Sequence, residues 1–77
     1  MQQLVECVPN FSNGRDPAVY DQIARAIDSV KGVTVLDVSA DADHNRTVIT
    51  FVGATDPVEQ AAFRAIKTAA ELIDLDV

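Results

Sequence analysis

An apolar stripe of helical period in the C-terminal part of the chain constrains the fold more than any other feature. Its members are Val58, Ala61, Ala62, Ala65, Ile66, Ala69, Leu72 and Ile73. Residues with this spacing lie on one face of an α-helix, and the abundance of alanine predicts close packing of that face on a sheet. Asp56 and Pro57, with Glu59 three residues after the aspartate, predict a capping box where this helix begins.

A second helix is predicted earlier in the chain from the same kind of start signal. Asp16 suits the N-cap and Pro17 the first helical position. The apolar face that follows consists of Val19, Ile23, Ala26, Ile27 and Val30. Gly32 is predicted to end the helix.

Three segments rich in β-branched residues are predicted to be strands: 3–8, 33–38 and 47–52, the last ended by Gly53. The order β-α-β-β-α gives five of the six elements of a ferredoxin-like unit. We therefore predict an α+β two-layer sandwich with a three-stranded antiparallel sheet in the order 1-3-2, lacking the fourth strand. With 77 residues, the chain is expected to be one domain over residues 1–77.

The lack of a fourth strand leaves the first strand at an exposed edge of the predicted sheet. That strand is apolar apart from Glu6, and apolar edges pair readily with other strands. Either Leu75–Val77 begins a strand that is cut short, or another polypeptide covers the edge. The expected partner at the first strand is the rest of a longer protein or a second copy.

Polar side chains are concentrated between the second and third strands, beyond what a hairpin turn needs. They are Asp41, Asp43, His44, Asn45 and Arg46. Because the first and second strands run parallel in the predicted sheet, the segments 10–15 and 39–46 should emerge at the same edge. We expect them to form one site, to which Asn10 also belongs.

The charge and composition of the chain exclude several functional classes. The net charge is −6 and the six basic residues are scattered, whereas nonspecific nucleic-acid binding needs clustered Lys and Arg. Every uncharged stretch is far too short to span a membrane. We therefore expect neither a nucleic-acid nor a membrane partner. The single cysteine rules out an intramolecular disulfide and favours a reducing, cytoplasmic location.

The run of Asp41, Asp43 and His44 also invites comparison with a metal site, because carboxylates and imidazole bind divalent ions. An EF-hand loop, however, requires a glycine and a terminal glutamate that are absent here. We expect no metal.

Each candidate side chain has a purely structural alternative. Arg46 would either bind an anionic group or pair with Asp41 or Asp43 across the hairpin, an exposed ion pair worth about 0–1 kcal/mol. Asn10 and Asn45 would either contact a ligand or form turns, since asparagine accepts left-handed backbone angles. The sequence leaves these alternatives open.

Several motifs resemble a known enzyme family. The opening motif Leu4–Ser12 with Gly14, the stretches 45–48 and 51–53, and the closing stretch 69–74 closely resemble the N-terminal subdomain of glutamate formimidoyltransferase, as in formimidoyltransferase-cyclodeaminase. The resemblance implies transfer of a formimino group from N-formimino-L-glutamate to tetrahydrofolate, the co-substrate, in histidine degradation.

The resemblance also carries expectations about catalysis. In the family, the first subdomain continues past the second helix into a segment with the histidine thought to act as acid and base. That residue is not His44, so the 77-residue chain alone is expected to be inactive. The family places an acidic residue at position 39, where this chain has Ser39, with Asp41 and Asp43 close by.

The chemistry of formimino transfer, which the resemblance implies, suggests a role for each of these residues. The formimino carbon passes between two amines through a cationic tetrahedral adduct, which needs proton transfer and charge stabilisation. Asp41 or Asp43 is suited to the cationic centre, Arg46 to a substrate carboxylate, and Asn10 and Asn45 to orienting the substrate. The alternative function is a non-catalytic, stand-alone binding or assembly module.

Overall fold

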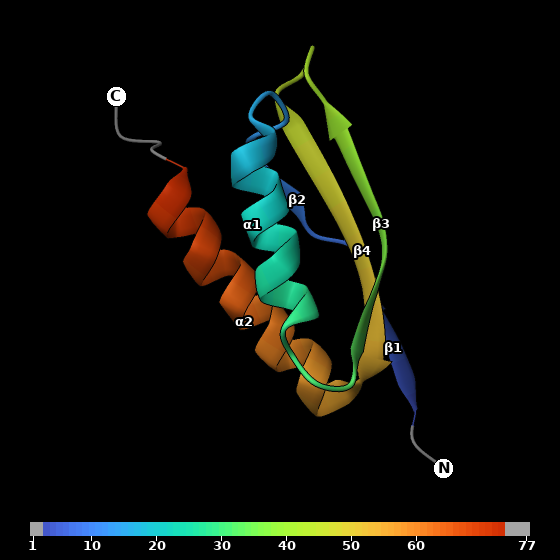
Figure 1. Cartoon of the computed structure of the whole chain (residues 1–77). Helices are drawn as coiled ribbons and strands as arrows, with labels where there is room; N and C mark the ends of the chain where they lie inside the picture. Colours follow the sequence, from blue (N-terminus) through green and yellow to red (C-terminus); the bar gives the residue numbers. More distant parts are fainter. Residues whose placement is uncertain (1–2, 74–77) are drawn as a thin grey trace.

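The computed structural model of the chain describes residues 3–73 and consists of an antiparallel sheet with two helices on one face (Figure 1). The elements in chain order are β1 (Leu4–Cys7), β2 (Asn10–Phe11), α1 (Pro17–Asp28), β3 (Val33–Asp41), β4 (Arg46–Ala54) and α2 (Thr55–Leu72). The predicted α+β architecture is confirmed. The possible strand at Leu75–Val77 lies outside the described residues.

The sheet is organised around β4, which pairs antiparallel with every other strand. β1 and β2 lie in succession along one side of β4, and β3 lies along the other side. Pro9 separates β1 from β2, yet its carbonyl still accepts a hydrogen bond from the Ile49 N–H (3.2 Å). The sheet therefore has four strands where three were predicted, because a proline, which has no N–H of its own, divides one extended path in two.

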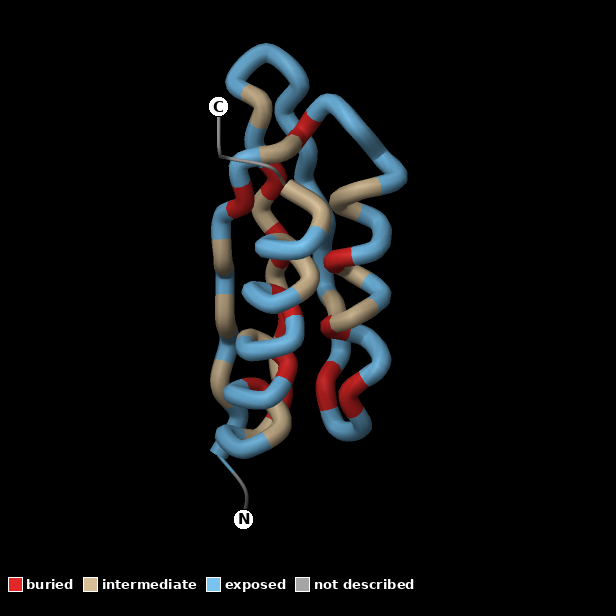
Figure 2. Tube along the Cα trace, turned by 90° about the vertical axis from the view of Figure 1, so that its left-hand side faces the viewer, coloured by how far each residue is buried: buried red, intermediate tan, exposed pale blue. Residues whose placement is uncertain are grey.

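The core lies between the sheet and the helices, as the burial pattern in Figure 2 shows. It consists of Phe11, Ile23, Ile27, Val30, Val33, Ile49, Phe51, Val58, Ala61 and Ala65. Along β4, alternate residues point into this core: Thr47, Ile49, Phe51 and Gly53 are buried. No helix of residues 3–73 covers the opposite face of the sheet. Neither described helix combines the length and apolar character needed to cross a membrane.

The hairpin strands extend further than their apolar residues predicted. β3 continues to Asp41 instead of ending at Val38, and a register shift between Val35 and Asp37 marks a bulge within it. Gly53 was expected to end the last strand but lies within β4. A Cβ at this position would lie 3.3 Å from the Val58 side chain and closer still to the Gly32 carbonyl. Close packing against a neighbouring turn, and not a chain reversal, requires this glycine.

The two helices begin differently although both contain an Asp-Pro pair. At α1, Asp16 is the N-cap and its Oδ1 accepts the Ala18 N–H (3.0 Å), as predicted. At α2, the N-cap is Ala54, with no side-chain capping bond, and Asp56 lies inside the first turn. The predicted capping box is therefore wrong. β4 runs directly into α2, so the helix has already begun when the chain reaches Asp56.

The apolar stripe on α2 is mostly but not entirely buried. Val58, Ala61 and Ala65 are buried, and Ala62, Ala69 and Ile73 pack partly against the core. Ile66, however, is 67% exposed, so its assignment to the buried face was wrong.

The two helix starts give a matched test of capping. We expect Asp16→Ala to lower the free energy of unfolding by about 1 kcal/mol, since it removes a side-chain cap. Asp56→Ala should change it by less than about 0.5 kcal/mol in high salt, which screens the helix macrodipole. Urea unfolding followed by circular dichroism measures both, with Asp16→Asn as the control that retains a capping side chain. Equal losses for the two alanine variants would contradict the assigned caps.

Candidate functional site

Two polar segments far apart in the sequence meet at one end of the sheet, at the top of Figure 1. The Gly14 N–H donates a hydrogen bond to Asn45 Oδ1 (3.0 Å), across 31 positions of sequence. The Thr47 hydroxyl donates to the Asn13 carbonyl, and Thr47 itself is fully buried. The prediction that segments 10–15 and 39–46 lie side by side is thus confirmed.

Gly14 allows the loop before α1 to approach the hairpin backbone this closely. A Cβ at this position would lie 2.7 Å from the Arg46 nitrogen and closer still to the carbonyl oxygens of Asp41 and Arg46. Any side chain here would push the loop away from the strand ends. A glycine is therefore required at position 14 because the hairpin backbone leaves no room for a side chain, and not because of its backbone angles.

Asn45 serves the fold of the hairpin in two ways. Its φ of 51° is left-handed, a conformation that asparagine tolerates better than most residues. Its N–H closes the turn on the Ala42 carbonyl (3.3 Å), and its side-chain oxygen receives the Gly14 N–H. The turn-forming alternative considered for Asn45 is therefore realised.

Asp41 organises the tip of the hairpin. Its Oδ2 lies 2.7 Å from His44 Nδ1, and its Oδ1 accepts the N–H groups of Asp43 (3.0 Å) and His44 (3.3 Å). The hydrogen bond from the His44 side chain, followed by that from the His44 backbone, lowers the pKa of Asp41. The side chain that contacts the Asp41 carboxylate is thus that of His44, and not that of Arg46 as one alternative supposed.

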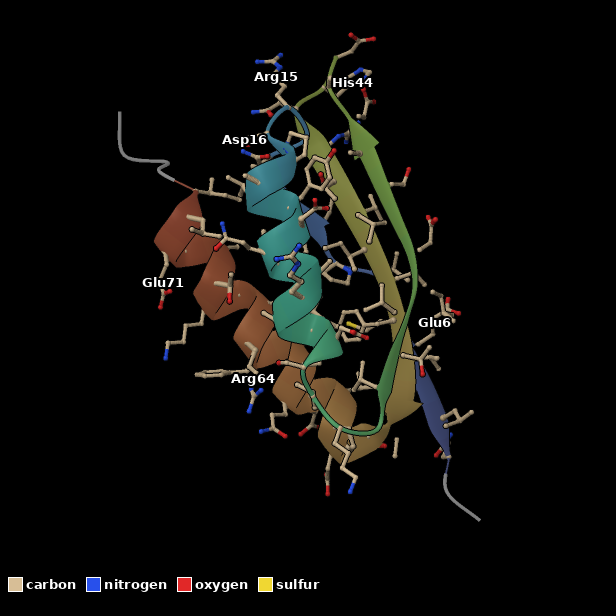
Figure 3. All side chains as sticks on the ribbon, in the orientation of Figure 1. Glu6, Arg15, Asp16, His44, Arg64 and Glu71 are labelled. Atoms are coloured by element: carbon tan, nitrogen blue, oxygen red, sulfur yellow. The ribbon has the colours of Figure 1, made fainter. Side chains whose placement is uncertain are left out.

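Arg15 adds a further link that the sequence did not suggest. Its Nε donates to the Ala42 carbonyl (2.8 Å) and its Nη2 lies 3.5 Å from the Asp43 carbonyl. Figure 3 shows Arg15 and His44 at the same end of the molecule. Because both acceptors are backbone carbonyls, no residue pattern could have revealed this contact.

The face of the sheet opposite the helices collects most of the candidate residues. Arg46 and Val48 alternate with the buried residues of β4 and so point to this face. Asn10 and Ser39 are the ladder partners of Val48 on its two sides, and Asp41 is the partner of Arg46. Directly opposed residues share a face. We call this surface, formed by Asn10, Ser39, Asp41, Arg46 and Val48, the open face.

The structure places Asn10 and Asp41 in strands instead of the predicted loops, whereas Asp43 lies in the predicted turn. Asn10 was expected in a loop but belongs to β2, so its side chain joins the open face instead of a turn. Asp43 lies at the exposed tip of the hairpin, beyond the paired strands. The structure therefore brings Asn10, Asp41 and Arg46 together on one surface and leaves Asp43 at its margin.

The charged and polar side chains of the open face suit an organic ligand with ionic groups. A guanidinium binds carboxylates through paired hydrogen bonds, and a carboxylate stabilises a nearby cation. Within residues 3–73, no group of three or more His, Cys, Asp or Glu side chains is arranged to hold a metal ion.

Sequence comparisons show the family of the chain. Residues 4–77 match the family described as formiminotransferase domain, N-terminal subdomain. The chain belongs to this family. It is 56% identical over 73 residues to a glutamate formimidoyltransferase of Thermoplasma acidophilum, covering 95% of this chain and 24% of that protein.

Two other relatives give the same picture. A glutamate formimidoyltransferase of Streptococcus pyogenes is 48% identical over 75 residues, covering 97% of this chain and 25% of the relative. A mouse formimidoyltransferase-cyclodeaminase is 52% identical over 75 residues, covering 97% of this chain and 14% of the relative. The chain thus spans a quarter or less of the length of these proteins.

The contact at Gly14 predicts a strong effect of a single methyl group. We expect Gly14→Ala to lower the free energy of unfolding by about 1–3 kcal/mol, because the added Cβ collides with backbone that cannot move aside. Ser12→Ala, at an exposed position in the same loop, is the control and should be nearly neutral. Urea denaturation measures both, and a neutral Gly14→Ala would show that the loop does not need this close approach.

The hydrogen bonds to Asp41 predict a pH-dependent hairpin. A lowered pKa in the folded chain means that the unfolded chain takes up the proton first as the pH falls. The stabilisation is therefore complete above the ordinary aspartate pKa of about 3.9 and is lost as the pH falls through the lower, folded value. In an NMR titration of the carboxyl carbons, His44→Ala should raise the Asp41 pKa. An unchanged Asp41 pKa in that variant would remove His44 as the cause.

Proposed function

We propose that this chain is the N-terminal subdomain of a glutamate formimidoyltransferase and contributes part of the surface that binds formiminoglutamate and tetrahydrofolate. The observation that carries the proposal is the placement of Asn10, Asp41 and Arg46 on one open face, within a family match that covers the chain. The names of the relatives supply the reaction.

The open face suggests a role for each side chain. Arg46 binds a carboxylate of the substrate, since formiminoglutamate carries two carboxylates and the folate tail ends in glutamate. Asp41 faces the cationic adduct, because its carboxylate is negatively charged, and the hydrogen bonds from His44 lower its pKa and so favour that form. Asn10, on the far side of Val48, orients the formimino group. Asp43 and Asn45 border this surface from the hairpin turn.

Proton transfer is assigned to polypeptide outside the described residues. α2 runs back from the end of β4 and finishes at the same end of the molecule as the hairpin (Figure 1). In the family that this chain resembles, the segment after this helix holds the histidine thought to act as acid and base. α2 lies on the helix side of the sheet, so that segment would have to pass around the sheet to reach the open face, and this part alone is expected to lack activity.

The proposal extends to the architecture and setting of the protein. We propose that residues 1–77 form one ferredoxin-like unit that lacks its fourth strand, since β1 and β3 flank β4 in the manner of that fold. We also place the protein in the cytoplasm, because Cys7 is a free thiol.

A chimeric enzyme tests the proposed function. The aligned segment of the Thermoplasma acidophilum enzyme is replaced by this chain, and formimino transfer to tetrahydrofolate is measured. We expect the chimera to be active and the isolated chain inactive. Arg46→Gln should raise the KM for formiminoglutamate about tenfold or more, through loss of a charged hydrogen bond. Lys67→Gln, on the exposed side of α2, is the control and should leave KM unchanged.

Two results would contradict the proposal. The first is a chimera with the circular dichroism and unfolding midpoint of the parent enzyme but no transfer activity, which would favour the alternative of a binding or assembly module. The second is an Arg46→Gln chimera with unchanged KM for both substrates.

A further inference from the structure

Asp41 and Arg46 are placed to form an ion pair across the hairpin, yet the structure keeps them apart. They are directly opposed at the end of the β3–β4 ladder and point to the same face. Opposed side chains of an antiparallel pair have Cβ atoms about 5 Å apart, which is within reach of an arginine. Among residues 3–73, however, Arg46 forms no ion pair, and it is exposed. A guanidinium therefore lies beside a carboxylate that it does not bind.

The carboxylate of Asp41 is bound instead by the turn that follows it. Its Oδ1 accepts the N–H groups of Asp43 (3.0 Å) and His44 (3.3 Å), and its Oδ2 lies 2.7 Å from His44 Nδ1. An ionised carboxylate only accepts hydrogen bonds, so Nδ1 carries the proton in this contact. Both oxygens of Asp41 are thus engaged on the side of the turn.

The shape of the turn explains why His44, and not Arg46, holds this carboxylate. The Asn45 N–H donates to the Ala42 carbonyl, and the left-handed φ of Asn45 leads the chain into β4. His44 follows Asp41 by three residues within this turn. Its side chain has fewer rotatable bonds than an arginine, and ordering a long arginine costs more conformational entropy. The nearby histidine therefore competes well for the carboxylate.

The other arginine at this end of the molecule is also engaged by the turn. Arg15 Nε donates to the Ala42 carbonyl (2.8 Å), and Arg15 Nη2 lies 3.5 Å from the Asp43 carbonyl. Figure 3 shows Arg15 and His44 at this end. Of the three basic side chains in the hairpin and the loop before α1, two therefore hold the turn. Within the described part of the chain, only Arg46 is left to bind an anion.

We propose that His44 is a positioning residue: it holds the Asp41 carboxylate at the turn and so leaves the Arg46 guanidinium free for a carboxylate of the substrate. The inference rests on the proposed function. Without the His44 ring, Asp41 Oδ2 would lose its partner and become free to pair with Arg46, its opposed neighbour. Asp41 would then compete with the substrate for the guanidinium. His44 thus acts on substrate binding through Asp41.

Steady-state kinetics of the chimera with the Thermoplasma acidophilum enzyme test this role. His44→Ala should raise the KM for formiminoglutamate about two- to fivefold, which is the range that competition from an exposed ion pair allows. It should change kcat by less. In the Asp41→Asn background, where kcat is expected to be lower, the same His44→Ala change should leave KM unchanged, because no carboxylate remains to compete.

His44→Asn is the matched control, since asparagine can present an N–H donor at nearly the position of Nδ1. This variant should keep the original KM. If His44 merely stabilised the turn, His44→Ala would raise KM equally with Asp41 present and in the Asp41→Asn background, and that result would overturn the inference. An unchanged KM in His44→Ala with Asp41 present would overturn it as well.

An NMR titration of the isolated chain tests the same contact without substrate. In high salt, which screens charges that are not in contact, Arg46→Gln should hardly change the pKa of Asp41 in the parent chain. In the His44→Ala variant, Arg46→Gln should raise the pKa of Asp41 clearly, because Arg46 has become the partner of the carboxylate. Equal effects of Arg46→Gln in the two backgrounds would contradict the inference.

The two readouts distinguish this inference from the proposed function. An inactive chimera would contradict the function, whereas the titration would still decide whether His44 keeps Asp41 from Arg46. An active chimera whose KM responds to Arg46→Gln but not to His44→Ala would contradict the positioning role alone.

Discussion

The contact between the loop before α1 and the end of the β3–β4 hairpin is the constraint on which the rest of the structure depends. Gly14 lies against the backbone of Asp41 and Arg46, and the Asn45 side chain and the Thr47 hydroxyl hold the loop there. Asp16 caps α1 two residues later, so the same contact sets where that helix starts over the sheet. Fold and candidate site therefore share one set of hydrogen bonds.

Local signals in the sequence predicted elements well where no neighbour interfered. Asp16 and Pro17 begin α1 as expected, because a loop precedes them and leaves the cap free to form. Asp56 and Pro57 carry the same signal but do not cap α2, because β4 continues directly into that helix. The helical period likewise placed Ile66 with the buried residues, although its side chain is mostly exposed. Both the start of α2 and the exposure of Ile66 depend on how neighbouring elements are arranged, which no local sequence pattern contains.

The location of the candidate site could be predicted, but not the use that the fold makes of its residues. Strand direction alone implied that segments 10–15 and 39–46 meet. The sequence could not show that the Asn45 and Asp41 side chains accept backbone hydrogen bonds that hold the hairpin and the neighbouring loop. Nor could it show that Arg15 contacts two backbone carbonyls of the turn. The polar residues of this short segment therefore both stabilise the hairpin and contribute side chains to the open face. Extension of β3 to Asp41 then moved Ser39 and Asp41 from a loop to a strand face.

The open face and the surface of α2 around Ile66 differ in chemistry. On the open face, the half-buried Val48 has a polar ladder partner on each side, which is how a surface that binds a polar ligand is composed. On α2, Ile66 is exposed, and Ala62, Ala69 and Ile73 beside it pack partly against the core. Contact with water is tolerable for the first surface and costly for the second. The polar face is therefore suited to a ligand that comes and goes.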